Sequence, residues 1–230
     1  MALSSHAQSG GHEALPGRRI FLVRHGETTG QSSQRFWGAT DVPLSELGER
    51  QVQGLWPYLE GHQFDAVVSS PMKRARRSLE VMASLGPDHF GDASSWRTYE
   101  GLREVNFGRI EGLTIDEIRE QEPDWAAAWD ADDFDGFPDG ETIRGFAERV
   151  ATGVDQALAD APAGDLLLVA HRGVIKNALC HLLRLDRSVL RPWSLDLASL
   201  TTLTELPGGG WALDRYNLTG SVVPLAAPNA

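Results

Sequence analysis

Two histidines and several arginines follow hydrophobic runs of the chain at positions where they could act together on an anion. Arg24-His25-Gly26 and His171-Arg172-Gly173 each come directly after a run of apolar residues, and Ser69-Ser70-Pro71 leads to Arg74 in the same way. A neutral imidazole is a competent nucleophile near pH 7, and guanidinium forks match the oxygens of a phosphoryl group. These residue types therefore indicate chemistry on an anionic group such as phosphate.

The elements that must position these side chains alternate between strands and helices. The predicted strands are Arg19–Val23, Phe64–Ser70 and Asp165–Ala170, with a hairpin from Ser199–Leu206 and Trp211–Asn217. The predicted helices begin at Ser45, Pro71, Thr142 and Val174. This alternation predicts an α/β fold, a three-layer α/β/α sandwich with a mainly parallel central sheet. The carboxyl ends of parallel strands share one edge, so we expect the histidines and arginines to meet in one crevice there.

Local signals set the expected ends of the helices and loops. Ser70 is the expected N-cap of the helix Pro71–Leu85, and Thr114 with Glu117 forms a capping box for a short helix. The region 125–139 is acidic and turn-rich, and we predict a loop that borders the mouth of the crevice. Its aromatic side chains can either contact a leaving group or anchor the loop to the body. They are Trp125, Trp129, Phe134 and Phe137.

Length and charge limit the class of protein. The chain has 230 residues, 41% hydrophobic and 23% charged, which is enough for one sizeable core. We predict a disordered tail over residues 1–17 and a single domain over residues 18–230. The formal net charge of −11 opposes binding to nucleic acid or to an anionic membrane, so an anionic ligand needs a local cluster of cations.

Cysteine usage and hydropathy predict a cytoplasmic location. Cys180 is the only cysteine, which excludes an intrachain disulfide and a CxxC site. The first residues lack the apolar core of a signal peptide, and no run approaches the roughly 20 apolar residues of a membrane span. The histidines outside the two motifs show no metal-ligand spacing, so we predict neither a metal nor a cofactor.

Six ordered blocks of the sequence resemble the histidine phosphatase superfamily, also called the phosphoglycerate mutase-like family. The blocks are LVRHGETTG, RFWGATDVPLSELGERQ, SSPMKRARRSLE, LREVNFGRIEGLT, PDGET and LLLVAHRGVIKNAL. An RHG triplet alone is a weak signal, whereas six blocks in the right order from about residue 20 to residue 183 are a strong one.

The resemblance implies a role for each residue of the crevice. His25 would be the nucleophile that becomes phosphorylated, and Glu104 would give a proton to the leaving oxygen. Arg24, Arg74 and His171 would surround the phosphoryl group. The flanking guanidiniums also disfavour the imidazolium form of His25, which keeps the nucleophile neutral.

Three further positions are candidate substrate contacts. Thr28 either touches phosphate or shapes the turn behind the first motif. Gln31 stands where the family often has asparagine, and it can still donate to a phosphoryl oxygen. Arg172 replaces a glycine that is frequent in the family, which predicts an additional cation for the substrate.

Three functions are compatible with these residues. The first is hydrolysis of a small phosphorylated metabolite through a phosphohistidine, which the short spacing after Glu104 favours because it resembles the phosphatase branch of the family. The second is a cofactor-dependent phosphoglycerate mutase, and the third is a non-catalytic phosphate-binding module. A homodimer is a further possibility, because Trp193, Trp211 and the hairpin could lie either in a subunit contact or in the core.

Overall fold

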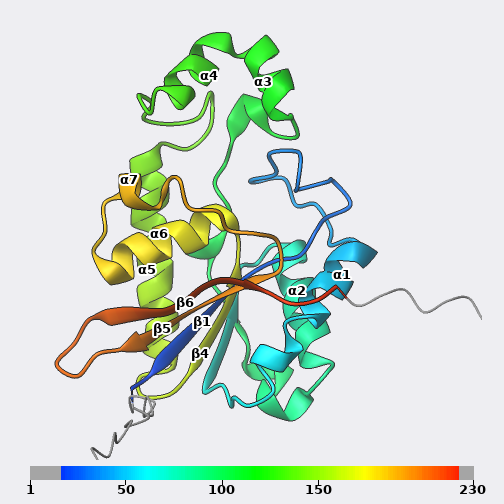
Figure 1. Ribbon diagram of the computed structural model, residues 1–230, viewed down its shortest axis with the longest axis vertical. Helices are drawn as coiled ribbons and strands as arrows, with labels where there is room; N and C mark the ends of the chain where they lie inside the picture. The colour runs from blue at the N-terminus through cyan, green and yellow to red at the C-terminus, as the bar shows by residue number, and fades with distance from the viewer. Residues whose placement is uncertain (1–16, 223–230) are drawn as a thin grey trace, which may run out of the picture.

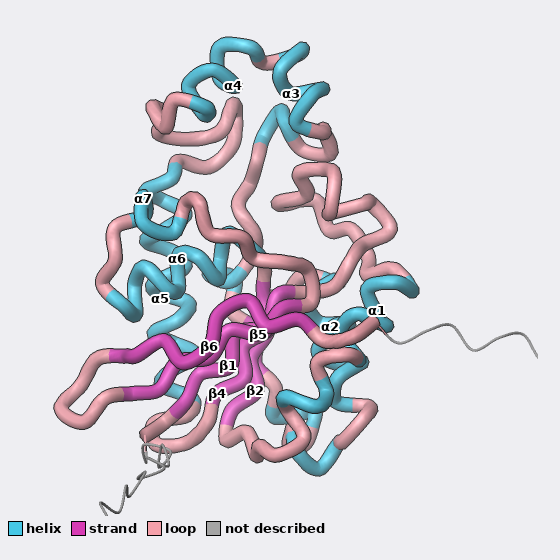
Figure 2. Tube along the Cα trace, in the orientation of Figure 1, coloured by secondary structure: helices cyan, strands magenta, loops and turns pink. Residues whose placement is uncertain are grey.

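A six-stranded sheet forms the centre of the computed structural model, which describes residues 17–222 (Figures 1 and 2). The strands are β1 (Arg19–Arg24), β2 (Ala66–Ser69), β3 (Arg97–Thr98), β4 (Leu166–Ala170), β5 (Ser199–Glu205) and β6 (Trp211–Thr219). Their order across the sheet is β3-β2-β4-β1-β5-β6. The first four run parallel to one another, whereas β5 runs antiparallel to both β1 and β6. Apart from Gly17, the predicted tail of residues 1–17 lies outside the described residues.

Helices fill the connections between the strands. The α-helices are α1 (Glu46–Gln53), α2 (Lys73–Ala83), α3 (Ile115–Gln121), α4 (Pro123–Asp130), α5 (Ile143–Asp160), α6 (Arg172–Leu183) and α7 (Arg187–Leu190). The 3₁₀ helices are η1 (Trp56–Tyr58), η2 (Pro87–His89), η3 (Ala93–Ser95), η4 (Glu100–Leu102) and η5 (Gly108–Ile110).

Side chains of the buried strands alternate between two hydrophobic cores, one on each face of the sheet. In β1, Ile20 and Leu22 pack with α5 and α6, whereas Phe21 and Val23 pack with α1 and α2 on the opposite face. The strand β4 is buried along its whole length because both faces are covered. The predicted three-layer sandwich with a mainly parallel sheet is confirmed.

The start of α2 differs from the prediction. The helix begins at Lys73 with the extended residue Met72 as N-cap, whereas Ser70 was the expected cap. The hydroxyl of Ser70 accepts the Met72 N–H at 3.3 Å, and it also contacts the imidazole of His171. With its hydroxyl bonded to the Met72 N–H and to His171, Ser70 stays in the turn that precedes the helix.

The predicted loop over residues 125–139 is also partly wrong, because its first part is the helix α4. Pro123 opens this helix, and the run of alanines at positions 126–128 favours helical structure. The capping box of Thr114 and Glu117 is confirmed at the start of α3. Together α3 and α4 project from the body of the molecule above the carboxyl edge of the sheet (Figure 1).

The C-terminal hairpin is confirmed as β5 and β6, and its tryptophans have neighbours within the chain. Trp193 packs edge-on against Tyr216, and Trp211 lies beneath the guanidinium of Arg18. Both tryptophans adjoin the core on the α5 side, while the predicted homodimer stays a prediction. Among the helices of residues 17–222, none is long and apolar enough to cross a membrane.

Candidate active site

His25 is held at the end of β1 with one ring nitrogen free for chemistry. Its backbone N–H donates to Ala170 O at 3.0 Å, which ties it to the end of β4. Its ring Nδ1 lies 2.7 Å from the carbonyl oxygen of Gly26. A carbonyl can only accept, so Nδ1 carries the proton and the lone pair of the neutral ring is on Nε2.

Two glycines let the first turn of α1 come close to the His25 loop. A Cβ on Gly26 would lie 2.3 Å from Gly48 O, and a Cβ on Gly48 would lie 2.1 Å from Glu27 O. Neither distance leaves room for a methyl group. Glycine disfavours a helix, and its presence at position 48 is therefore explained by close packing against the backbone that follows the candidate nucleophile.

His171 lies beside His25 with its own proton on the opposite nitrogen. The two ring centroids are 5.1 Å apart. Arg74 Nε donates to His171 Nδ1 at 3.1 Å, which leaves Nε2 as the donor to Ser70 Oγ at 2.8 Å. Both nitrogens of His171 are thus already occupied by protein partners.

Both imidazoles are kept neutral by their surroundings. Burial, with the guanidiniums of Arg74 and Arg24, lowers the pKa of His25 well below its ordinary value of 6.5. Burial, then Arg74 and His25, lowers the pKa of His171 in the same direction. The neutral form is the one that can act as a nucleophile, as the sequence predicts for His25.

Arg74 and Arg24 bring two cations to the imidazoles. Arg74 is completely buried, and besides its bond to His171 it donates to the carbonyls of Thr40 at 3.0 Å and Gly38 at 2.9 Å. Arg24 donates to Leu195 O through one terminal nitrogen, while its buried Nε has no partner among residues 17–222. An unpaired buried N–H is costly, so an anion at this point would stabilise Arg24.

The carboxyl group of Glu104 is oriented by two backbone amides. Its oxygens accept from Val105 N at 3.0 Å and from Gly173 N, in the first turn of α6, also at 3.0 Å. A Cβ on Gly173 would lie 2.5 Å from Glu104 Oε1, so this close approach requires glycine. Arg149 on α5 supports the same turn by donating to the carbonyls of Arg103 at 2.7 Å and Glu104 at 3.0 Å.

The three candidate substrate contacts take different positions. Thr28 is buried, and its hydroxyl pairs with Ser32 Oγ at 2.8 Å. Gln31 is exposed with φ of 60°, a left-handed conformation that asparagine adopts more easily than glutamine, and its contact to phosphate stays a prediction. Arg172 lies with Glu104 in the wall of a cavity, next to the histidine site.

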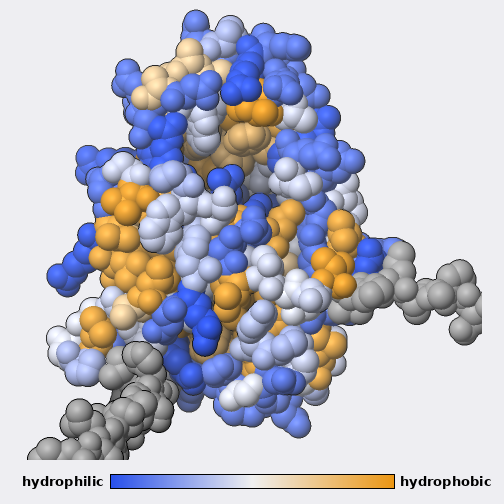
Figure 3. Space-filling model, viewed as in Figure 1, coloured by the Kyte–Doolittle hydropathy of each residue, from blue (hydrophilic) through white to orange (hydrophobic). Residues whose placement is uncertain are grey.

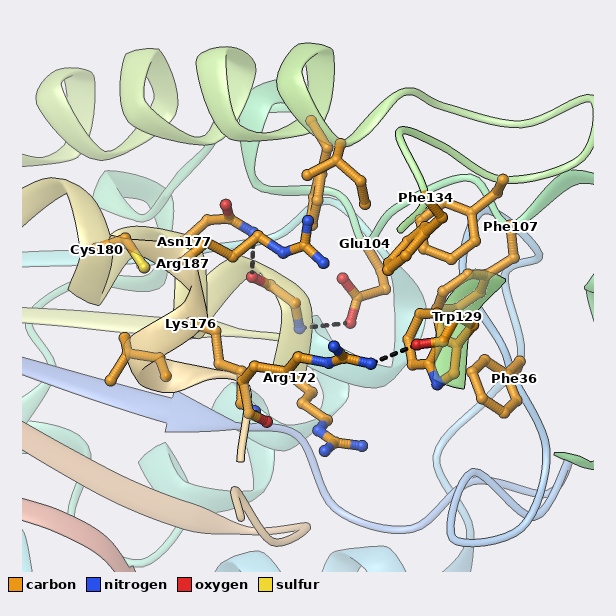
Figure 4. A pocket seen from close by; sticks show the side chains of 16 residues that line it. Phe36, Glu104, Phe107, Trp129, Phe134, Arg172, Lys176, Asn177, Cys180 and Arg187 are labelled. Atoms are coloured by element: carbon orange, nitrogen blue, oxygen red, sulfur yellow. Dashed lines mark hydrogen bonds between the residues drawn. The ribbon is translucent and has the colours of Figure 1, made fainter. Parts of the chain in front are cut away.

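This cavity has a volume of about 210 Å³ and two chemically different walls (Figure 4). One wall is aromatic, with Phe36, Phe107, Trp129, Phe134 and Phe137. The other wall comes from α6 and α7 and contains Arg172, Lys176, Arg187 and Arg191. Figure 3 shows hydrophobic surface beneath α3 and α4 next to strongly hydrophilic side chains.

The aromatic residues of 125–139 pack against one another as well as lining the cavity. Trp129 and Phe134 lie 4.9 Å apart between ring centroids, and Phe137 contacts Phe107 at 4.9 Å. Trp125 packs against this group and donates to Gly136 O at 2.8 Å. These aromatic side chains therefore anchor the segment and also line the cavity, while their contact with a leaving group stays a prediction.

Three polar residues of this region, Ser70, Lys176 and Arg187, were not predicted to belong to the site. Ser70 was assigned to a helix cap, although it bonds His171, and only the order of the strands reveals that contact. Lys176 lies on the helix predicted from Val174, but its place on the same face as Arg172 follows only from the structure, in which α6 begins at Arg172. Nothing in the sequence indicated a role for Arg187, because the helix α7 was not predicted.

The fold and the positions of these side chains agree with a family assignment. The profile described as "Histidine phosphatase superfamily (branch 1)" matches residues 20–219, and the chain belongs to this superfamily. Bifunctional protein Rv2228c of Mycobacterium tuberculosis is 33% identical over 204 residues, which cover 88% of this chain and 54% of that protein. The chain therefore spans about half the length of the first curated relatives it matches.

Two further relatives have names that indicate different reactions, one a mutase and the other a phosphatase. The probable phosphoglycerate mutase GpmB of Escherichia coli O1:K1 is 30% identical over 163 residues, 70% of this chain and 72% of that protein. The solved structure of mycobacterial glucosyl-3-phosphoglycerate phosphatase Rv2419c is 28% identical, with a TM-score of 0.74. The match covers 87% of this chain and 99% of that one.

Proposed function

We propose that this protein hydrolyses a phosphomonoester of a small metabolite through a phosphohistidine on His25. The observation that carries the proposal is the tautomer of His25, whose Nδ1 faces Gly26 O and whose Nε2 lone pair is left free beside two guanidiniums. Membership of the histidine phosphatase superfamily and the likeness to a glucosyl-3-phosphoglycerate phosphatase support it.

The reaction divides one displacement into two easier ones. In the first step, His25 Nε2 attacks phosphorus, the N–P bond forms, and the P–O bond to the leaving group breaks while Glu104 gives its proton to that oxygen. In the second step, Glu104 takes a proton from water, the water oxygen attacks phosphorus, and the N–P bond breaks. Inorganic phosphate leaves, and His25 and Glu104 return to their starting states.

Arg24 and Arg74 have the chemistry to stabilise the transferred group. Negative charge spreads over the equatorial oxygens in the transition state, and fixed guanidinium donors lower its energy. Arg74 is held by carbonyls of residues 38 and 40, so it needs no reorganisation when the substrate arrives. Removal of one such donor should cost about 3 kcal/mol in the transition state.

The substitution His25→Ala tests the proposal. It should abolish phosphate release and also the acid-labile phosphate label that a phosphohistidine gives. His181→Ala is the matched control, because His181 is exposed and pairs with Asp155 away from the cavity. Turnover and labelling that persist in the His25→Ala protein would reject this nucleophile.

Metal independence is part of the same proposal. Histidine, arginine and glutamate side chains supply the nucleophile, the charge and the proton, so activity should persist in excess EDTA. Orthovanadate should inhibit, because it takes the trigonal bipyramidal shape of the transferred group. Loss of activity in EDTA that returns with added metal would contradict the mechanism.

Phosphoglycerate mutase is the second candidate, favoured by the 30% identity to a probable mutase. In that reaction the phosphoryl group returns from His25 to a bound glycerate instead of to water. Assays of glycerate 3-phosphate with and without the 2,3-bisphosphate separate the two functions. Isomerisation without comparable phosphate release would favour the mutase.

A further inference from the structure

The cavity beyond Glu104 contains two cations without an anionic partner. Arg172 and Lys176 are four positions apart on α6 and therefore lie on the same face of the helix. The exposed side chain of Arg172 makes no hydrogen bond or ion pair with any residue of 17–222, and Lys176 Nζ donates to the carbonyl of Arg191 at 3.0 Å. Two like charges one helical turn apart destabilise each other until an anion joins them.

The other two cations of this wall share one carboxylate, that of Asp132. Asp132 accepts an ion pair from Arg191 at 2.7 Å and lies 3.5 Å from Arg187. The guanidinium of Arg187 also lies 4.9 Å from the centre of the Phe134 ring. These contacts hold the aromatic segment in place, and they leave Arg172 and Lys176 as the cations available to a ligand.

Lys176 keeps its charge at neutral pH. Burial, with the charge of Arg172, lowers the pKa of Lys176 to about 8, so this side chain is still protonated in most molecules at pH 7. Burial, and then the charge of Arg172, lowers the pKa of Arg24 to about 10. Arg172 therefore links the electrostatics of the histidine site and of the cavity.

The opposite wall offers an apolar surface to the same ligand. Phe36, Phe107 and Trp129 face the cavity, and a flat apolar group packed on them would gain both burial and aromatic contact (Figure 4). Glu104 stands at the boundary between the cavity and the histidine site. A group bound in the cavity would therefore belong to the leaving alcohol, whose oxygen Glu104 would protonate.

On the basis of the proposed phosphatase function, we propose that the leaving alcohol of the substrate carries a flat apolar group and a carboxylate. The apolar group lies on the aromatic wall, and the carboxylate binds Arg172 and Lys176. A singly charged group suits this place better than a second phosphate, because Glu104 shares the cavity, becomes a carboxylate once it has given its proton, and then repels a doubly charged group more strongly. Arg172 and Lys176 are then the residues that determine specificity.

Three synthetic esters test this proposal on the whole protein. Phenyl phosphate has the ring alone, 3-carboxyphenyl phosphate adds the charge, and 3-carbamoylphenyl phosphate has the same shape without the charge. We expect kcat/KM for the carboxy ester to exceed that for the carbamoyl ester by about tenfold, as one charge-assisted hydrogen bond gives. Equal values would overturn the proposal, while turnover of phenyl phosphate would leave the phosphatase function standing.

Two substitutions test whether the preference for the carboxy ester arises in the cavity. Lys176→Met and Arg172→Met keep an unbranched side chain without the charge, and each should reduce the ratio of the carboxy to the carbamoyl ester. Arg76→Met is the matched control, since Arg76 is exposed on α2 and should leave the ratio as in the parent protein. A ratio that stays the same in both cavity variants would show that the carboxylate is recognised elsewhere.

Equilibrium binding distinguishes a failure of the carboxylate site from a failure of the phosphatase function. The His25→Ala protein cannot form the phosphohistidine, so calorimetry can measure its dissociation constants for the carboxy and carbamoyl esters without turnover. Tighter binding of the carboxy ester, lost in the His25→Ala/Lys176→Met protein, would support the carboxylate site even if no ester were hydrolysed. Equal dissociation constants would reject the site.

Discussion

At the scale of single residues, the two buried histidines differ in which nitrogen carries the proton. Gly26 O accepts from Nδ1 of His25, whereas Arg74 donates to Nδ1 of His171 and so places that proton on Nε2. Hydrogen-bond partners alone therefore give identical side chains different chemistry. His25 keeps a free lone pair, and His171 has both nitrogens engaged.

Nitrogen NMR tests this assignment. At about pH 6, the ring ¹⁵N shifts should show both histidines neutral, with the Nδ1–H tautomer at residue 25 and the Nε2–H tautomer at residue 171. An ordinary imidazole is mostly protonated at this pH, but the lowered pKa values keep both neutral. The same tautomer at both residues, or imidazolium shifts, would contradict the assignment.

At the scale of elements, the candidate proton donor depends on contact between two helices and one turn. The turn that follows η4 presents Glu104, α6 orients its carboxyl group through the Gly173 amide, and α5 holds the turn through Arg149. None of these three elements contains the nucleophile. The relative position of the acid and His25 is thus set by packing on the face of the sheet that α5 and α6 cover.

Gly173→Ala should separate stability from activity. Alanine favours a helix by about 0.5–1 kcal/mol over glycine, so α6 should not be destabilised. The new methyl group would lie 2.5 Å from Glu104 Oε1 and must displace the carboxyl group. A displacement of about 1 Å costs about 100-fold in rate, which we expect in kcat while the melting temperature is maintained.

Gly61→Ala is the control for this change, because a Cβ at Gly61 meets no atom within 4 Å. Its activity should equal that of the parent protein. Full activity of Gly173→Ala would show that the position of the Glu104 carboxyl group is not critical.

At the scale of the whole molecule, the order of the strands brings the candidate residues together. In the sheet, β4 lies between β1 and β2, with Arg24 opposite Ala170 and Ser69 opposite Val169. The residues that follow these strands therefore emerge side by side at the same edge. That placement also buries two imidazoles in the fold, which links its stability to pH.

The free energy of unfolding should fall as the pH is lowered through about 6.5. The unfolded chain binds protons on His25 and His171 near pH 6.5, while the native state binds them only at the lower pKa values. Each histidine contributes a slope of up to about 1.4 kcal/mol per pH unit in that interval. Urea unfolding at several pH values between 5 and 8 measures this slope.

His25→Asn isolates the contribution of one histidine from that of the carboxylates, which titrate in both proteins. The variant should lose less stability than the parent between pH 6.5 and pH 5. Parallel curves for the two proteins would show that His25 is not held neutral by the fold.

Much of the fold and of the candidate site was predictable from local patterns. The apolar run before His171 was predicted as a covered strand and the segment from Thr142 as a helix, as β4 and α5 confirm. The start of α2 and the helix α4 were missed. In the first case the Ser70 hydroxyl bonds a histidine 101 positions away, which no local pattern contains.

By itself, the sequence determined the residue types, the alternation of strands and helices, and the polar residues that end the buried strands. These features depend on short-range periodicity and on the chemistry of single side chains. The tertiary structure decided which nitrogen of each histidine is free, how Gly173 orients Glu104, and which cations of the cavity lack a partner. Those properties arise from contacts between residues far apart in the chain, because hydrogen bonding, burial and charge pairing depend on distance in space.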